Sequence, residues 1–174
     1  MSLANIEFKI EEAEYFRQRM LDVQAEIKPT TFNLSAFLAA GRSVLQYAQD
    51  DAKQAPGGET WYCDEVGANF VVRFLRDIRN IQIHRRPIEP SKSVTIEVGI
   101  LGGAKVEAAQ VTHQYWFPHP SLEDERCMWF HNAPKLQLVV NLCDQKDVFT
   151  LCSEYMDGVK AIVADGRTSN MLRT

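Results

Sequence analysis

The pattern of apolar and polar positions predicts three amphipathic helices in the first half of the chain. Between residues 4 and 27, apolar side chains recur every three or four positions, so they share one face of a helix. Pro29 is expected to end this helix, because proline forces the residue before it out of helical geometry. A second helix is predicted from about residue 30 to about residue 53. A third is predicted from about residue 64 to residue 84, with Pro87 as its stop.

After residue 90 the pattern changes to a period of two. Apolar residues alternate with polar or small ones, as is typical of a half-buried strand: Val94, Ile96, Val98 and Ile100. The pair Gly102-Gly103 signals a tight turn, after which residues 105–114 return as the partner strand. The sequence therefore predicts a β-hairpin over about residues 93–114. The aromatic and proline-rich residues 115–120 are expected to form an ordered loop or an edge.

A last helix is predicted to begin at Asp144, and its apolar residues at helical spacing are expected to form its buried face: Val148, Leu151, Tyr155, Val159 and Ile162. Asp147 is placed in its first turn, where the helix dipole favours an anion, and Gly166 is expected to close it. The polar tail, residues 167–174, is expected to be frayed. The apolar run at residues 136–142 is too short to assign to a helix or a strand.

These elements predict a mainly α fold, a four-helix bundle with a β-hairpin inserted before the last helix. The length of 174 residues suits a single domain, residues 1–174. A division into two domains near residue 90 is the alternative. It is less favoured, because each half would be small and the last helix needs a partner for its apolar face.

Composition and charge restrict the function classes. The chain is 45% hydrophobic and 24% charged, as in soluble globular proteins. It has no apolar run long enough to span a bilayer and no recognisable secretory signal, so a cytoplasmic protein without a membrane partner is expected. The net charge of −4 argues against coating nucleic acid by bulk electrostatics, but it allows a local basic cleft. The spacing of the histidines and four cysteines fits no zinc pattern, and no cofactor or metal site is predicted.

Cationic residues gather at the end of the third predicted helix: Arg73, Arg76, Arg79, His84, Arg85 and Arg86. Within this segment, Asn80 and His84 are four residues apart and share a helix face, which Arg79 flanks. Arg79 is a permanent cation that can bind phosphate through two nitrogens, and His84 can exchange a proton near neutral pH. Asn80 can orient the imidazole or a ligand. The segment is therefore either an anion-handling site or a solvated basic helix end.

The motif Arg79-Asn80-x-x-x-His84, late in a helix of a bundle, resembles the signature of the HEPN superfamily. Members are small all-α domains, often dimeric, and many are metal-independent ribonucleases. The resemblance implies that Arg79, Asn80 and His84 are catalytic in a cleft shared by two copies of the helix. The ribose 2′-hydroxyl of RNA would attack the adjacent phosphate, with His84 as general acid or base and Arg79 stabilising the phosphoryl oxygens. The remaining arginines would bind the substrate: Arg73, Arg76, Arg85 and Arg86.

Three functions follow as expectations. The first is a HEPN-like endoribonuclease or an RNA-associated protein of the stress or toxin type. The second is a non-catalytic homodimeric module that binds another protein, for example a toxin–antitoxin partner, through its aromatic residues and hairpin. The third is a small-ligand binder that uses the arginines as anion clamps.

Overall fold

The computed structural model describes residues 3–84, 87–100, 106–119 and 133–173. The predicted mainly α fold with a hairpin before its C-terminal part is confirmed, although two helices follow the hairpin within the described residues. The elements, in chain order, are α1 (Leu3–Asp22), α2 (Ile27–Ala52), α3 (Gly58–Ala68), α4 (Phe70–His84), β1 (Ser91–Ile100), β2 (Val106–Trp116), α5 (Ala133–Gln145) and α6 (Val148–Thr168).

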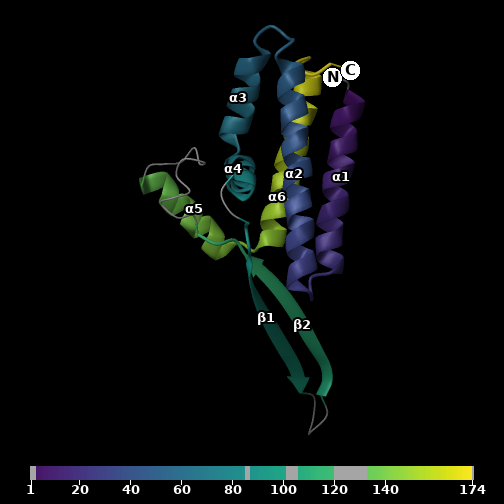
Figure 1. Ribbon diagram of the computed structural model, residues 1–174, viewed down its shortest axis with the longest axis vertical. Coiled ribbons are helices and arrows are strands. Elements are labelled where there is room, and N and C mark those ends of the chain that lie inside the picture. Colours follow the sequence, from purple (N-terminus) through teal and green to yellow (C-terminus); the bar gives the residue numbers. More distant parts are fainter. Residues whose placement is uncertain (1–2, 85–86, 101–105, 120–132, 174) are drawn as a thin grey trace.

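Three long helices, α1, α2 and α6, lie side by side and enclose most of the core (Figure 1). All five residues predicted for the inner face of the last helix are buried: Val148, Leu151, Tyr155, Val159 and Ile162. α4 crosses this group and packs on both α2 and α6. No helix in the described ranges is long and apolar enough to cross a membrane.

Pro29 lies inside the first turn of α2, so the prediction that it ends the first helix is wrong. α1 already ends at Asp22, and a short turn leads into α2. Proline is tolerated at this place because the first N–H groups of a helix have no partner within the helix. Thr30 helps to fix the turn, since its buried hydroxyl donates a hydrogen bond to the carbonyl of Val23 over 3.0 Å.

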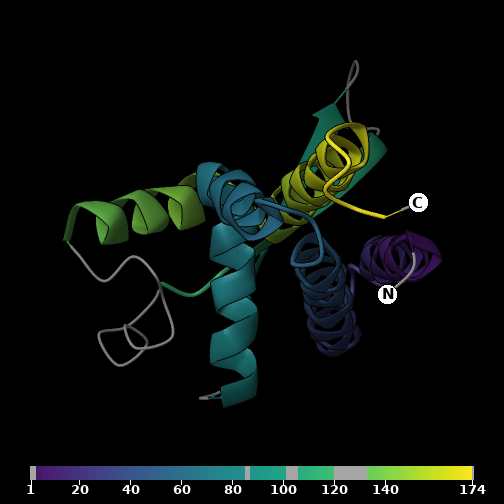
Figure 2. The ribbon, with the colours of Figure 1, turned by 90° about the horizontal axis from the view of Figure 1, so that it is seen from above.

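The single helix predicted over residues 64–84 is interrupted at Asn69, which has extended backbone angles. The side-chain oxygen of Asn69 accepts a hydrogen bond from the backbone N–H of Val72 (3.0 Å) and thereby caps the start of α4. Its amide packs closely on Gly158 of α6, where a Cβ atom would lie 2.4 Å from Asn69 Nδ2. α4 consequently takes a different direction from α3 (Figures 1 and 2).

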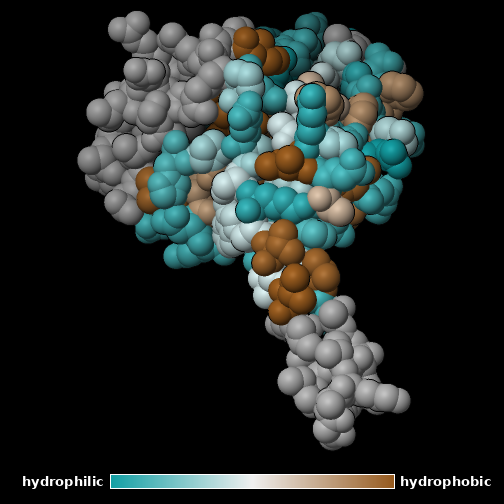
Figure 3. Space-filling view, turned by 60° about the horizontal axis from the view of Figure 1, so that its bottom comes forward, coloured by the Kyte–Doolittle hydropathy of each residue, from teal (hydrophilic) through white to brown (hydrophobic). Residues whose placement is uncertain are grey.

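The β-hairpin forms where it was predicted and projects from the helical body (Figure 1). β1 and β2 pair antiparallel, with Ile96 opposite Val111. The predicted turn at Gly102-Gly103 lies outside the described residues. The alternation predicted one buried face, yet Val94, Ile96 and Val111 are 49%, 62% and 50% exposed. The apolar face of the hairpin is therefore open near its base (Figure 3), because the strands extend beyond the helices that would cover it.

The base of the hairpin is attached to the turn between α1 and α2. The Tyr115 hydroxyl donates to the carbonyl of Gln24 over 2.8 Å, and Lys92 Nζ donates to the carbonyl of Ala25. Tyr115 is fully buried. These contacts hold the start of β1 and the end of β2 against the helices.

The C-terminal part differs from its prediction in three places. The unassigned apolar run lies in α5, and Asp144 belongs to the end of α5, whereas α6 begins at Val148 with Asp147 as its N-cap. Gly166 lies within α6 and makes room for Trp61 and Leu172. The tail packs back on the bundle and is not frayed in its described part: Leu172 is 3% exposed, and the Arg173 N–H donates to Asp51 over 2.6 Å.

Candidate functional site

Two of the arginines predicted to bind substrate are engaged in holding α4 in place. Arg76 donates from Nε and Nη2 to one oxygen of Asp77, over 3.3 and 3.2 Å, and Asp77 is only 2% exposed. Arg73 Nη1 donates to the carbonyl of Gly67 at the end of α3 (3.2 Å). Burial and the positive charge of Arg76 lower the pKa of Arg73, whereas Asp77 raises it. Arg73 therefore stabilises the junction between α3 and α4, and Arg76 balances the charge of the buried Asp77 carboxylate.

Arg79, the predicted catalytic arginine, is half-buried against α2 and α6. Its Nε is shielded from solvent and has no hydrogen-bond partner among the described residues. Burial lowers the pKa of Arg79, the charge of Arg42 on α2 lowers it further, and Tyr155 on α6 opposes this effect. Arg79 thus interacts electrostatically with groups of both neighbouring helices.

Arg42 is a site residue that the sequence analysis did not identify. Its Nη2 donates to Gln46 Oε1 over 3.1 Å, while its Nη1 is shielded from solvent and has no partner in the part of the chain that the structure describes. Arg42 follows Gly41, where α2 and α6 approach so closely that a Cβ atom would lie 2.4 Å from Cε1 of Tyr155. The signal for this contact was the group of small residues at positions 39–41, which permits close helix approach.

Two buried tyrosines, Tyr62 on α3 and Tyr155 on α6, lie within range of the charges of Arg42 and Arg76. Burial raises the pKa of both phenols, and the charges of Arg42 and Arg76 lower it in both cases. We refer to the five side chains as the arginine–tyrosine cluster: Arg42, Tyr62, Arg76, Arg79 and Tyr155. It is assembled from α2, α3, α4 and α6.

The rest of the predicted motif lies at the C-terminal end of α4. Asn80 is half-buried, and His84 is the last residue of the helix. The side chain of His84 and both Arg85 and Arg86 lie outside the described part of the chain. Residues five apart, such as Arg79 and His84, start from helix positions about 140° apart. Their convergence on one ligand stays a prediction.

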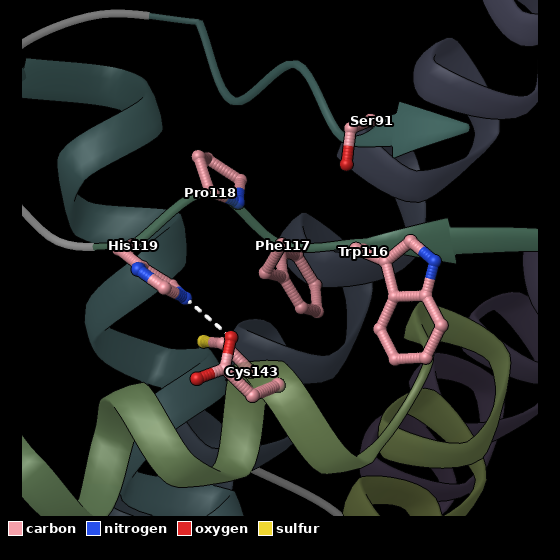
Figure 4. Close-up of a pocket in the computed structure, with 7 residues that line it drawn as sticks. Ser91, Trp116, Phe117, Pro118, His119 and Cys143 are labelled. Carbon is pink, nitrogen blue, oxygen red and sulfur yellow. Dashed lines mark hydrogen bonds and ion pairs between the residues drawn. The ribbon is translucent and has the colours of Figure 1, made fainter. Parts of the chain in front are cut away.

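A second feature is a surface pocket of about 390 Å³ between the end of β2 and α5 (Figure 4). Its described lining residues are Ser91, Trp116, Phe117, Pro118, His119, Cys143 and Asp144. His119 points to α5, where its Nε2 lies 2.8 Å from Asp144 Oδ1, and both side chains are more than half exposed. Burial raises the pKa of the Cys143 thiol to about 12, so it stays protonated and is a poor nucleophile. The ion pair of His119 and Asp144 at this pocket connects β2 to α5. Among its described residues the pocket offers no activated nucleophile.

The described side chains contain no group of three or more His, Cys, Asp or Glu residues that could hold a metal ion. Comparison of the chain with family models, with curated proteins and with solved structures found no match. The candidate site therefore rests on its own geometry and on the motif of α4.

Proposed function

We propose that the chain is a HEPN-like protein that binds RNA and cleaves it without a metal ion. The observation that carries this proposal is the position of Arg79 on a helix of a mainly α fold, directly before Asn80 and five residues before His84. Its Nε has no hydrogen-bond partner within the described ranges. The motif places a permanent cation, an amide and an imidazole in the last two turns of α4.

In the proposed reaction, the ribose 2′-hydroxyl attacks the adjacent phosphorus and loses its proton, and the bond from phosphorus to the 5′-oxygen breaks. The leaving 5′-oxygen takes up a proton, which leaves a 2′,3′-cyclic phosphate and a 5′-hydroxyl. His84 transfers protons and Arg79 stabilises the negative charge on the phosphoryl oxygens.

The test is cleavage of synthetic single-stranded RNA in the presence of EDTA. We expect cyclic-phosphate products from the wild type and a loss of activity of at least about 100-fold in His84→Ala and in Arg79→Ala. Arg19→Ala is the matched control, because Arg19 is an exposed arginine on α1 that pairs only with its neighbour Asp22 within the described residues. Absence of cleavage by folded wild-type protein over a range of RNA sequences would refute the proposal.

A mixture of the two inactive variants tests the shared cleft. If each site takes Arg79 from one chain and His84 from the other, mixed dimers of Arg79→Ala and His84→Ala contain one intact site. After exchange of subunits, about a quarter of the wild-type activity returns, since half of the dimers are mixed and each has one of two sites. No recovery would mean that the two residues act within one chain.

The open apolar face of the hairpin favours a second candidate function, that of a non-catalytic dimeric module. Val94, Ile96 and Val111 are exposed on one face, and an isolated two-stranded hairpin is marginal in water. We propose a second copy of this chain as the occupant. Replacing Val94 and Ile96 by threonine then converts the dimer to a monomer in light scattering, whereas Thr95→Ser on the opposite face does not. A dimer that persists in the double variant would exclude this interface.

A further inference from the structure

The pocket between the end of β2 and α5 has walls that are held in place by contacts with other elements (Figure 4). The indole of Trp116 forms one side, and its Nε1 donates to Ser93 Oγ of the neighbouring strand over 3.1 Å. Phe117 is 3% exposed and packs edge-on against Phe74 of α4, with ring centroids 5.8 Å apart. The volume of about 390 Å³ falls within the range of small-molecule sites, roughly 300 to 1,000 Å³. The pocket is therefore preformed and large enough for a small organic ligand.

The charges around this pocket favour a cation. Its described lining carries one carboxylate, that of Asp144, and no lysine or arginine. The Cys143 thiol adds no charge at neutral pH, because burial raises its pKa to about 12. Lys146, which follows α5, is engaged by Glu154 of α6. The described partner of Asp144 is His119, whose Nε2 lies 2.8 Å from its Oδ1.

The ion pair leaves the Asp144 carboxylate able to bind a ligand. Both side chains of the pair are more than half exposed, so solvent screens their attraction. A carboxylate has two oxygens and can accept several hydrogen bonds, and within the described ranges His119 is the only side chain paired with this one. An ammonium group is the donor that complements such an acceptor, because a hydrogen bond between two charged groups is stronger than a neutral one.

The opposite side of the pocket is apolar and aromatic. Trp116 and His119 lie at opposite sides of the pocket, with Phe117 between them (Figure 4). An indole face attracts both flat apolar groups and cations. The pocket therefore suits a ligand with a positive charge at one end and an apolar ring at the other.

We propose that this pocket binds a small organic amine, whose ammonium group pairs with Asp144 and whose apolar body packs on Trp116 and Phe117. The site is built from both strands of the hairpin, the segment after β2 and α5. It uses none of the residues of the α4 motif and requires neither His84 nor RNA.

The experiment compares the binding of phenethylamine with that of phenethyl alcohol, which has nearly the same shape but no charge. It is carried out at pH 8, where imidazole is ordinarily neutral and the amine is still protonated. Calorimetry gives Kd, and the NMR signal of the Trp116 indole N–H, assigned with Trp116→Phe, reports the place of binding. We expect the amine to bind at least about 10-fold more tightly than the alcohol.

Two variants separate the charge of Asp144 from its contact with the hairpin. Asp144→Asn should weaken amine binding by about 10-fold and leave binding of the alcohol unchanged. His119→Gln removes the imidazole of the same ion pair but keeps the carboxylate, so it should bind the amine at least as tightly as the wild type. Trp116→Ala should weaken the binding of both ligands. Asp22→Asn is the matched control, because Asp22 is an exposed carboxylate on α1.

Absence of amine binding by the folded wild type, equal affinity for the amine and the alcohol, or an unchanged Kd in Asp144→Asn would each overturn the proposal. An equal loss in Asp144→Asn and His119→Gln would overturn it as well, because Asp144 would then act only by holding α5 in place. His84→Ala should bind the amine as the wild type does, so failure of the nuclease leaves this site standing.

Discussion

Replacement of Gly41 by alanine tests the contact between α2 and α6 that brings Arg42 to the cluster. The new Cβ atom would lie 2.4 Å from Cε1 and 2.9 Å from Oη of Tyr155. The ring cannot easily move away, because it is 1% exposed and packs edge-on against Phe37 with centroids 5.8 Å apart. We place the cost near the upper end of the usual range for overpacking, about 3 kcal/mol.

Part of this cost is offset by helix propensity, since alanine is about 1 kcal/mol more favourable than glycine within a helix. The net expectation is a loss of about 2 kcal/mol in the free energy of unfolding, which lowers Tm by about 4 to 8 °C in a chain of this size. Urea unfolding followed by circular dichroism measures the free energy, and a heating scan measures Tm.

Gly67→Ala is the matched control for this substitution. Gly67 is also helical, but its added Cβ would meet only Arg73 Nη1 at 3.9 Å, so this variant should be stabilised by up to about 1 kcal/mol. Adding Tyr155→Leu to Gly41→Ala should remove most of the cost of the alanine, which appears as a favourable coupling energy in a double-mutant cycle. If Gly41→Ala is stabilised as much as Gly67→Ala, the close approach of α2 and α6 is refuted.

Two further predictions concern buried polar groups. Asp77→Asn removes the charge that compensates Arg76, so we expect a loss of about 3 kcal/mol in urea unfolding; an unchanged midpoint would contradict the buried pair. With Cys127, which lies outside the described residues, replaced by serine, only exposed Cys63 should react with a thiol reagent at pH 8 in the folded chain, because burial raises the pKa of the Cys143 and Cys152 thiols. The thiols of the unfolded chain ionise at a lower pH than these two buried thiols. The stability that the two groups contribute is therefore complete below the ordinary thiol pKa and falls as the pH rises towards 12. Equal reactivity of all three thiols would contradict their burial.

The elements that could be predicted from sequence are those whose pattern is set by a single buried face. The five residues predicted for the inner face of α6 are all buried, since they repeat with the helical period over a long stretch, although Cys152, Met156 and Val163 are buried there as well. The position of the hairpin was also predicted, because alternation and a glycine pair are local signals. The interruption at Asn69 could not be predicted, because apolar residues keep the helical period across it. Two contacts of Asn69 accompany the break: its side chain caps α4 at Val72, and its amide packs on Gly158 of α6, a tertiary contact that the sequence does not show.

The candidate site, too, could be predicted from sequence only in part. Spacing along one helix placed Arg79, Asn80 and His84 in the last turns of α4, but it could not show that Arg76 is occupied by Asp77 or that Arg79 is near Arg42. Charge balance in a buried cluster depends on which helices meet, and a single sequence contains that information only indirectly. The indirect signal is an arginine directly after small residues. Because α2 lies close to α6 at Gly41, the guanidinium of Arg42 has little room except at the interface between these helices. Within the described residues, Arg42 donates to Gln46 of its own helix, and its charge lowers the pKa of Arg79. This second effect, more than the spacing of the motif, connects α2 to the surroundings of Arg79 on α4.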